Sequence, residues 1–172
     1  MAEVFLRRRL QEGGVEAQIS SAGLRLEGEP APDLGVEVLA ERGLDLTAHR
    51  SRMIDRDLLR SADLVVAMAR EHVREAVLAA PDIWPRVFTL KELVRRGAEV
   101  GGRAPGESLE AWLARLHAGR NRSDLVGLSA EDDVFDPLGG TREDYEGAAN
   151  EISALVDRMV RLAWPTAARE TA

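Results

Sequence analysis

Hydrophobic and polar residues alternate along this chain with two different periods. Strand-like runs are short, and they occupy residues 15–20, 63–68 and 86–90. Helix-like runs lie between and beyond them, at residues 2–12, 32–42, 54–62, 70–80, 91–96, 107–119 and 142–163. Short strands that alternate with helices are typical of an α/β fold with a parallel sheet. Because the helices outnumber the strands, the predicted sheet looks one strand short.

Glycine and proline mark the boundaries of these runs. Gly13 and Gly14 end the first helix, and Pro32 suits the first turn of the second. Residues 97–106, with the sequence "GAEVGGRAPG", interrupt the helical period, so we expect a loop there. Residues 165–172 are expected to form a flexible tail, because chain ends that bury little usually fray.

Composition narrows the class of protein. The chain has 172 residues, of which 45% are hydrophobic and 31% charged, as in one soluble globular domain. A net charge of −7 argues against nucleic acid or an anionic membrane as a partner, since both bind basic surfaces. No apolar run approaches the roughly 18 residues that a membrane span needs. The N-terminal residues show no signal-peptide pattern, so we expect a cytoplasmic location.

Residue counts also limit the chemistry. The chain contains no cysteine, so the residues given offer no disulfide, no thiolate metal ligand and no thiol nucleophile. The histidines, His49, His72 and His117, lie far apart in sequence without the spacing of metal ligands. We therefore expect no metal site and no cofactor.

One polar stretch, "EDDVFDPLGGTREDYE" at residues 131–146, crowds acids around an Asp-Pro and a Gly-Gly pair. Asp136 precedes the proline, and this arrangement is common in turns. From the pattern alone a turn is the favoured interpretation, and a carboxyl that donates a proton is the alternative. Asp132 and Asp133 precede no proline, so we expect them to be solvated loop residues.

Several segments share their order and spacing with one enzyme family. They are "MAEVFLRRRL", "ISSAG", "GEPAPDLGVEVLAERGLDLTAHRSRMI", "DLLRSADLVVAM", "RVFTL" and "VFDPLGG". The most specific is His49-x-x-Arg52-x-Ile54 after a Gly-Leu-Asp-Leu turn, with an Asp-Pro downstream. Together they resemble the low-molecular-weight protein-tyrosine-phosphatase family, whose fold is a three-layer, doubly wound parallel sheet. The resemblance predicts one domain over residues 1–164, with an insertion at about 97–130.

The resemblance implies an activity and roles for individual residues. Members of the family hydrolyse phosphomonoesters, on phosphotyrosine proteins or small aryl phosphates, through a cysteinyl-phosphate. Asp136 matches the general acid, which protonates the leaving oxygen. Ser21 and His49 match residues whose hydrogen bonds brace the phosphate loop. Arg52 matches an arginine of the same segment, but a surface ion pair is its favoured interpretation.

The sequence departs from the family pattern in two places. Leu138 and Gly139 follow the Asp-Pro where the family often carries aromatic residues that stack on the substrate ring. This change weakens the expected preference for phosphotyrosine. Ala69 replaces an aspartate that often follows Met68, which we expect to remove a helix cap rather than a catalytic group.

The resemblance also predicts what this chain lacks. Family members open with a strand and a phosphate loop of the form Cys-x5-Arg-Ser-Pro, and the next helix often starts as this chain does at Met1. We therefore expect an N-terminal truncation that removes the first central strand and the nucleophile, and a chain that is inactive and unstable alone. The alternatives are a catalytically dead relative that acts as a binding or regulatory module, and an arsenate reductase of the same fold, which also needs cysteines.

Overall fold

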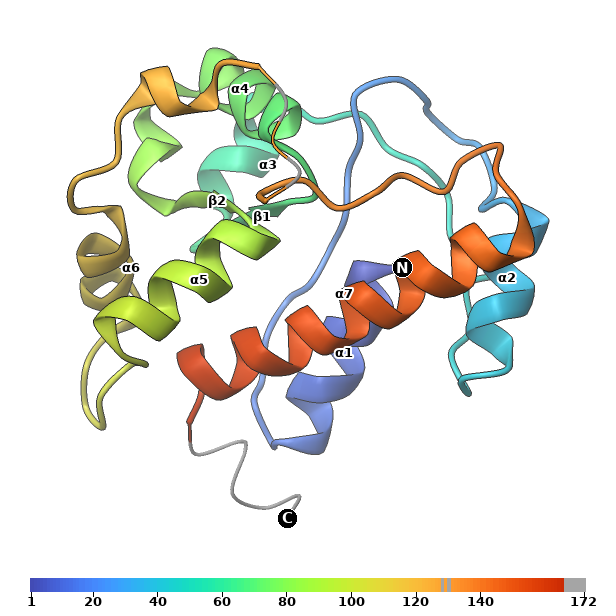
Figure 1. Ribbon diagram of the computed structural model, residues 1–172, viewed down its shortest axis with the longest axis horizontal. Coiled ribbons are helices and arrows are strands. Elements are labelled where there is room, and N and C mark those ends of the chain that lie inside the picture. Colours follow the sequence, from blue (N-terminus) through green and yellow to red (C-terminus); the bar gives the residue numbers. More distant parts are fainter. Residues whose placement is uncertain (128, 130, 166–172) are drawn as a thin grey trace.

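The structure is a computed structural model, and it describes residues 1–127, 129 and 131–165. Its elements follow one another in the order helix, helix, helix, strand, helix, strand and then helices to the end (Figure 1). The helices are α1 (Ala2–Glu12), α2 (Asp33–Ala40), α3 (Arg56–Ser61), α4 (Arg70–Ala79), α5 (Leu90–Val100), α6 (Leu109–His117) and α7 (Arg142–Ala163). The strands are β1 (Val65–Ala67) and β2 (Val87–Thr89), and 3-10 turns form η1 (Pro81–Arg86) and η2 (Arg122–Leu125).

The two strands form a parallel pair, with Val66 opposite Phe88. The chain crosses from β1 to β2 through α4 and η1, which is the connection that parallel strands require. The strands expected at 63–68 and 86–90 are therefore confirmed, each with a shorter paired centre. In Figure 1 the pair lies between α4 and α5, and both helices contact β2.

The strand expected at 15–20 is wrong. This segment runs as a separate strip of chain beside the strand pair in Figure 1, and none of its residues joins a ladder among the residues that the structure describes. Val15 and Ile19 still pack partly against the core, so the alternation of apolar residues was detected correctly. A strand also needs a neighbouring backbone to hydrogen-bond with, and the described part of the chain places none there.

The loop expected at 97–106 begins later than predicted, because α5 continues through Gly97 to Val100. A Cβ at Gly97 would lie 3.0 Å from Leu162 Cδ1 of α7 and 3.3 Å from Trp112 Cζ2 of α6. The glycine therefore permits close packing of three helices instead of ending one. Gly101, with φ of +87°, ends the helix.

Helix α7 packs along α1, α2 and α5 (Figure 1). Its buried residues recur every three or four positions, as expected of a helix with one face in the core: Tyr145, Ala148, Ala149, Ile152, Val156, Met159, Val160 and Ala163. The expectation of a long helix at 142–163 is confirmed. The expected tail at 165–172 lies, apart from Pro165, outside the described residues.

Arg120 joins the segment after α6 to the strand pair. Its guanidinium lies 3.9 Å from the ring centre of Trp84 and 4.0 Å from that of Phe88, and its side chain is 2% exposed. It donates to both carboxylate oxygens of Glu92, at 2.6 and 2.9 Å, and to the carbonyl oxygens of Trp84 and Val87. All of these groups surround the buried guanidinium of Arg120. Because Arg120 belongs to the insertion expected at about 97–130, its contacts attach that segment to the strand pair.

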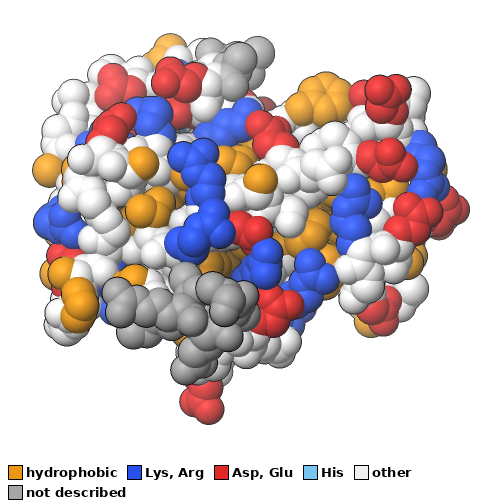
Figure 2. All heavy atoms as spheres, turned by 60° about the horizontal axis from the view of Figure 1, so that its bottom comes forward, with side chains coloured by type: hydrophobic (Ala, Val, Ile, Leu, Met, Phe, Trp, Pro, Cys, Tyr) orange, Lys and Arg blue, Asp and Glu red, His pale blue; other side chains and the backbone are white. Residues whose placement is uncertain are grey.

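Charge is spread over the surface in pairs. Figure 2 shows acidic and basic side chains interspersed over one face, with apolar ones between them. Within the described residues, no helix combines the length and apolar character needed to cross a membrane. The same residues bring together no group of acids and histidines that could hold a metal ion.

Candidate functional site

The start of α1 contacts a polar side chain from a distant part of the sequence. Glu3 lies in its first turn, and its carboxylate accepts hydrogen bonds from the Ser21 hydroxyl and the Arg7 guanidinium. Burial alone would raise the pKa of Glu3, but these two hydrogen bonds and the positive charges of Arg7 and His49 bring the pKa below its ordinary value. Ser21, one of the two predicted supports of a phosphate loop, therefore contacts this carboxylate, and His49, the other, acts on it only through its charge.

Backbone hydrogen bonds join the segment that carries Ser21 to the segment that follows His49. The amide of Gly23 donates to the carbonyl of Arg52 at 2.7 Å, and the amide of Ile54 donates to the carbonyl of Gly23 at 2.9 Å. The Arg52 guanidinium donates to the carbonyl of Ser21 at 3.3 Å. Arg52 forms no ion pair among the described residues, so the surface ion pair expected for it is wrong. Its role is to tie together the loops that carry Ser21 and His49.

Asp136 lies on the exposed loop that leads into α7. Its Oδ1 accepts a hydrogen bond from the amide of Leu138 at 3.1 Å, which is the turn that the Asp-Pro pattern predicted. Phe135 and Leu138 beside it are 61% and 63% exposed. Within the described residues no hydrogen bond or ion pair connects Asp136 to Ser21 or His49. Backbone hydrogen bonds thus join the segments that carry two of the three predicted site residues, and the third lies on the loop before α7.

The acids just before this loop are not solvated, which corrects the expectation from sequence. Asp132 is only 5% exposed. Its Oδ2 accepts from Arg70 Nε and Nη2 at 3.0 and 2.7 Å, and its Oδ1 accepts from Arg95 Nη2 at 3.0 Å. Burial alone would raise the pKa of Asp132, but the hydrogen bonds and charges of the two arginines lower it.

Asp133 anchors the same segment through its side chain and its backbone. Its Oδ1 accepts from the amide of Arg70 at 2.8 Å, and its Oδ2 accepts from the amide of Ser129 at 3.0 Å. Its carbonyl accepts from Lys91 Nζ at 2.8 Å. The next amide, that of Val134, donates to a carbonyl at the end of β1 at 2.8 Å. Sequence reasoning missed this anchor because its partners are distant in sequence.

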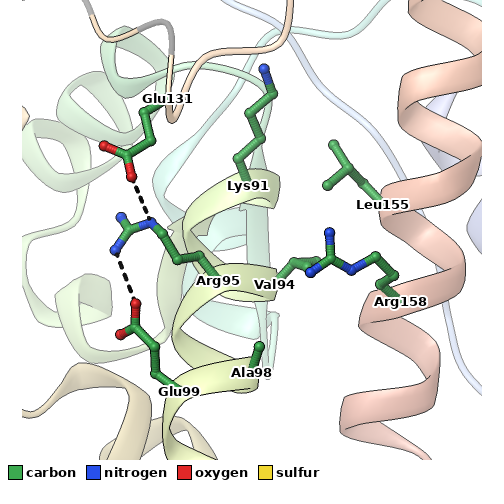
Figure 3. Close-up of a pocket in the computed structure, with 8 residues that line it drawn as sticks. All are labelled: Lys91, Val94, Arg95, Ala98, Glu99, Glu131, Leu155 and Arg158. Carbon is green, nitrogen blue, oxygen red and sulfur yellow. Dashed lines mark ion pairs between the residues drawn. The ribbon is translucent and has the colours of Figure 1, made fainter.

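Two hollows lie away from the three predicted site residues, Ser21, His49 and Asp136. One of about 510 Å³ lies between α5 and α7, and Figure 3 shows Arg158 of α7 pointing across it toward α5. In the same view Arg95 turns to Glu99 and Glu131, with which it forms ion pairs. A second hollow of about 210 Å³ is lined by Arg95 and by Asp132. Neither is lined by any of the three predicted site residues.

Comparisons with known proteins agree on one family. The sequence model described as "Low molecular weight phosphotyrosine protein phosphatase" matches residues 1–103. The chain is 32% identical over 120 residues to the "Probable low molecular weight protein-tyrosine-phosphatase EpsP" of Ralstonia solanacearum, which covers 69% of this chain and 80% of that protein. It is 28% identical over 160 residues to the "Protein-arginine-phosphatase" of Geobacillus stearothermophilus, which covers 92% of this chain and 83% of that protein.

Solved structures agree as well. The crystal structure of the low molecular weight protein tyrosine phosphatase from T. tengcongensis matches with a TM-score of 0.68 at 30% identity, over 93% of this chain and 87% of that one. The family match lies over the segments that build the start of α1, the loops of Ser21 and His49 and the strand pair. The expected α/β fold with a parallel sheet is confirmed, and the chain belongs to the low molecular weight phosphotyrosine protein phosphatase family.

Proposed function

We propose that this chain carries the general acid and the phosphate-loop supports of a phosphatase that removes phosphoryl groups from proteins. The observation that carries the proposal is the hydrogen bond from Ser21 to Glu3 in the first turn of α1, made by a segment that backbone hydrogen bonds join to the one that follows His49. A helix N-terminus favours a bound phosphate, because its free amides and its dipole both attract anions. Polar side chains gathered there are placed to hold a phosphate-binding loop in position.

Hydrolysis of a phosphomonoester needs a nucleophile, donors to the phosphoryl oxygens and an acid for the leaving oxygen. Asp136 is the proposed acid. It donates its proton as the bond from phosphorus to the leaving oxygen breaks, and its carboxylate then takes a proton from the attacking water. No residue of this chain is a cysteine, so a cysteinyl-phosphate mechanism draws its nucleophile from outside these residues.

Phosphotyrosine on a protein is the first candidate substrate, as the family description indicates. Phosphoarginine on a protein is the second. It is favoured by Leu138 and Gly139, which offer no aromatic ring after the Asp-Pro, and by the similarity to a protein-arginine-phosphatase over 92% of this chain. Both leaving groups require a proton, so Asp136 would have the same role with either.

A fusion tests the role of Asp136. A strand and a Cys-x5-Arg-Ser-Pro loop are placed ahead of Met1, and hydrolysis of phenyl phosphate and p-nitrophenyl phosphate is measured for the fusion and for the chain alone. We expect turnover from the fusion only. Asp136→Asn should lower kcat on phenyl phosphate by about 10²–10⁴-fold, the usual contribution of a general acid. The loss on p-nitrophenyl phosphate should be smaller, because its leaving group needs less protonation.

Asp45→Asn is the matched control, since Asp45 is also exposed and its Oδ1 also accepts a turn amide, that of Thr47, at 2.8 Å. Equal losses in the two variants would contradict the role of Asp136. Turnover by the unfused chain after thiol alkylation would contradict the cysteinyl-phosphate route. A fusion that binds phosphate and hydrolyses neither ester would favour the binding-module alternative.

A further inference from the structure

Helix α4 begins without a capping side chain of its own. Its N-cap residue is Ala69, which has the extended backbone of a cap (φ −147°, ψ 159°) but no side-chain oxygen. Such a position usually carries Ser, Thr, Asp or Asn, whose oxygen accepts a hydrogen bond from an amide of the first turn. The lost cap expected from sequence is therefore real at this position, and the first-turn amides need another acceptor.

Asp133 supplies that acceptor from 63 residues downstream. Its Oδ1 accepts the hydrogen bond of the Arg70 amide at 2.8 Å, and its negative charge lies at the positive end of the helix dipole. The second oxygen of the same carboxylate accepts from the amide of Ser129 in its own loop, at 3.0 Å. One side chain thus joins the start of α4 to the segment that leads to Asp136.

Neighbouring contacts make this attachment stiff. Asp132 binds the guanidinium of Arg70 while Asp133 binds its amide, so both ends of one residue are held by consecutive acids. Val134 is hydrogen-bonded to the carbonyl of Met68 at the end of β1. Asp136 follows Asp133 by three residues, and a chain of that length spans at most about 11 Å. A fixed Asp133 therefore limits the volume in which the Asp136 carboxylate can lie.

We propose that Asp133 is a positioning residue for Asp136, acting through the α4 N-terminus that it caps. The proposal rests on the proposed function, in which Asp136 is the general acid. Loss of the Asp133 carboxylate frees the loop as well as the helix end. A cap restored at Ala69 repairs the helix end only.

Because the chain has no cysteine, a single introduced cysteine can be spin-labelled without background. Leu138→Cys, on an exposed residue two positions after Asp136, reports the mobility of the loop by its EPR line shape. Leu78→Cys, on an exposed residue of α4, is the matched control label. Exchange of the Arg70 amide with deuterium, followed by NMR, reports the cap. Each readout is taken in the unmutated background, in Asp133→Ala and in Ala69→Asp/Asp133→Ala.

We expect Asp133→Ala to make the loop label mobile and to speed exchange of the Arg70 amide by about fivefold, the factor that corresponds to a typical lost cap. In the double variant the Arg70 amide should be protected again while the loop label stays mobile. The proposal is overturned if the double variant also immobilises the label, because Asp133 is then a helix cap alone. It is equally overturned if Asp133→Ala leaves the label unchanged.

The control label separates loop release from general unfolding. If Asp133→Ala also mobilises the label at residue 78, the chain has lost its fold. The loop label is then compared between the unmutated background and the double variant, whose cap is restored, by the same criteria. None of these readouts measures hydrolysis. Failure of the proposed phosphatase function would therefore leave the EPR result intact, and the two failures can be distinguished.

Discussion

The buried contact of Arg120 allows a quantitative prediction of stability. In Arg120→Met, Glu92 keeps its place with a side chain only 13% exposed, but both of its carboxylate oxygens lose their donor. The carbonyls of Trp84 and Val87 lose a donor as well. Removing one partner of a buried ion pair destabilises a protein by about 3–5 kcal/mol, because the remaining charge is left unpaired.

For a domain of this size, about 2–4 °C of melting temperature corresponds to each kcal/mol, so the melting temperature should fall by about 6–20 °C. Urea unfolding followed by far-UV circular dichroism gives the free energy directly. Arg60→Met is the control, since Arg60 pairs with Asp82 with both side chains about half exposed, and such pairs contribute at most about 1 kcal/mol.

A second substitution separates charge from packing. If the unpaired carboxylate causes the loss, Arg120→Met/Glu92→Gln should recover part of it, because a neutral amide is less costly to leave without a partner than a carboxylate. The reasoning is refuted if the free energies of unfolding of Arg120→Met and Arg60→Met differ by less than about 1 kcal/mol, because the buried pair would then contribute no more than an exposed one.

Other features give two further predictions. Gly97→Ala should destabilise the fold by about 1–3 kcal/mol, because the added methyl group meets Leu162 and Trp112. Gly147→Ala, in open space on α7, should stabilise the fold by up to about 1 kcal/mol. The midpoints of urea unfolding compare the two variants, and equal midpoints would contradict the packing argument. Asp132 has a folded-state pKa below its ordinary value, so its stabilising effect is complete above the unfolded pKa of about 4 and is lost as the pH falls through the folded pKa. Asp132→Asn should destabilise at neutral pH and flatten the acid limb of a stability curve measured from about pH 7 to pH 2; an unchanged acid limb would show that this carboxylate does not titrate with unfolding.

The features predicted well from sequence were those set by local periodicity. The face that α7 buries and the centres of β1 and β2 follow from the spacing of apolar residues, which is a property of the segment itself. The loop expected to begin at Gly97 begins later. In the sequence alone, a glycine that ends a helix cannot be told from one that lets a neighbouring helix pack closely. Residues 15–20 have the alternation of a strand, but pairing also depends on what lies beside them.

The candidate site was recoverable only in part, for a related reason. Ser21 and His49 were found through resemblance, and no local pattern would have placed Ser21 on Glu3. Asp132 looked like a solvated acid because the sequence shows its charge but does not show that Arg70 and Arg95 pair with it. The turn at Asp136 was predicted correctly, since an Asp-Pro followed by glycines fixes its own backbone.

The distant cap of α4 has a consequence for the order in which the molecule folds. A helix capped by its own N-terminal residue can complete its first turn as soon as that turn has been synthesised. Here the acceptor arrives 63 residues later, so the first turn of α4 gains its partner only after the chain has closed a large loop. Helix completion and the docking of the segment before α7 are thereby one event in folding, and contacts between such distant residues form slowly.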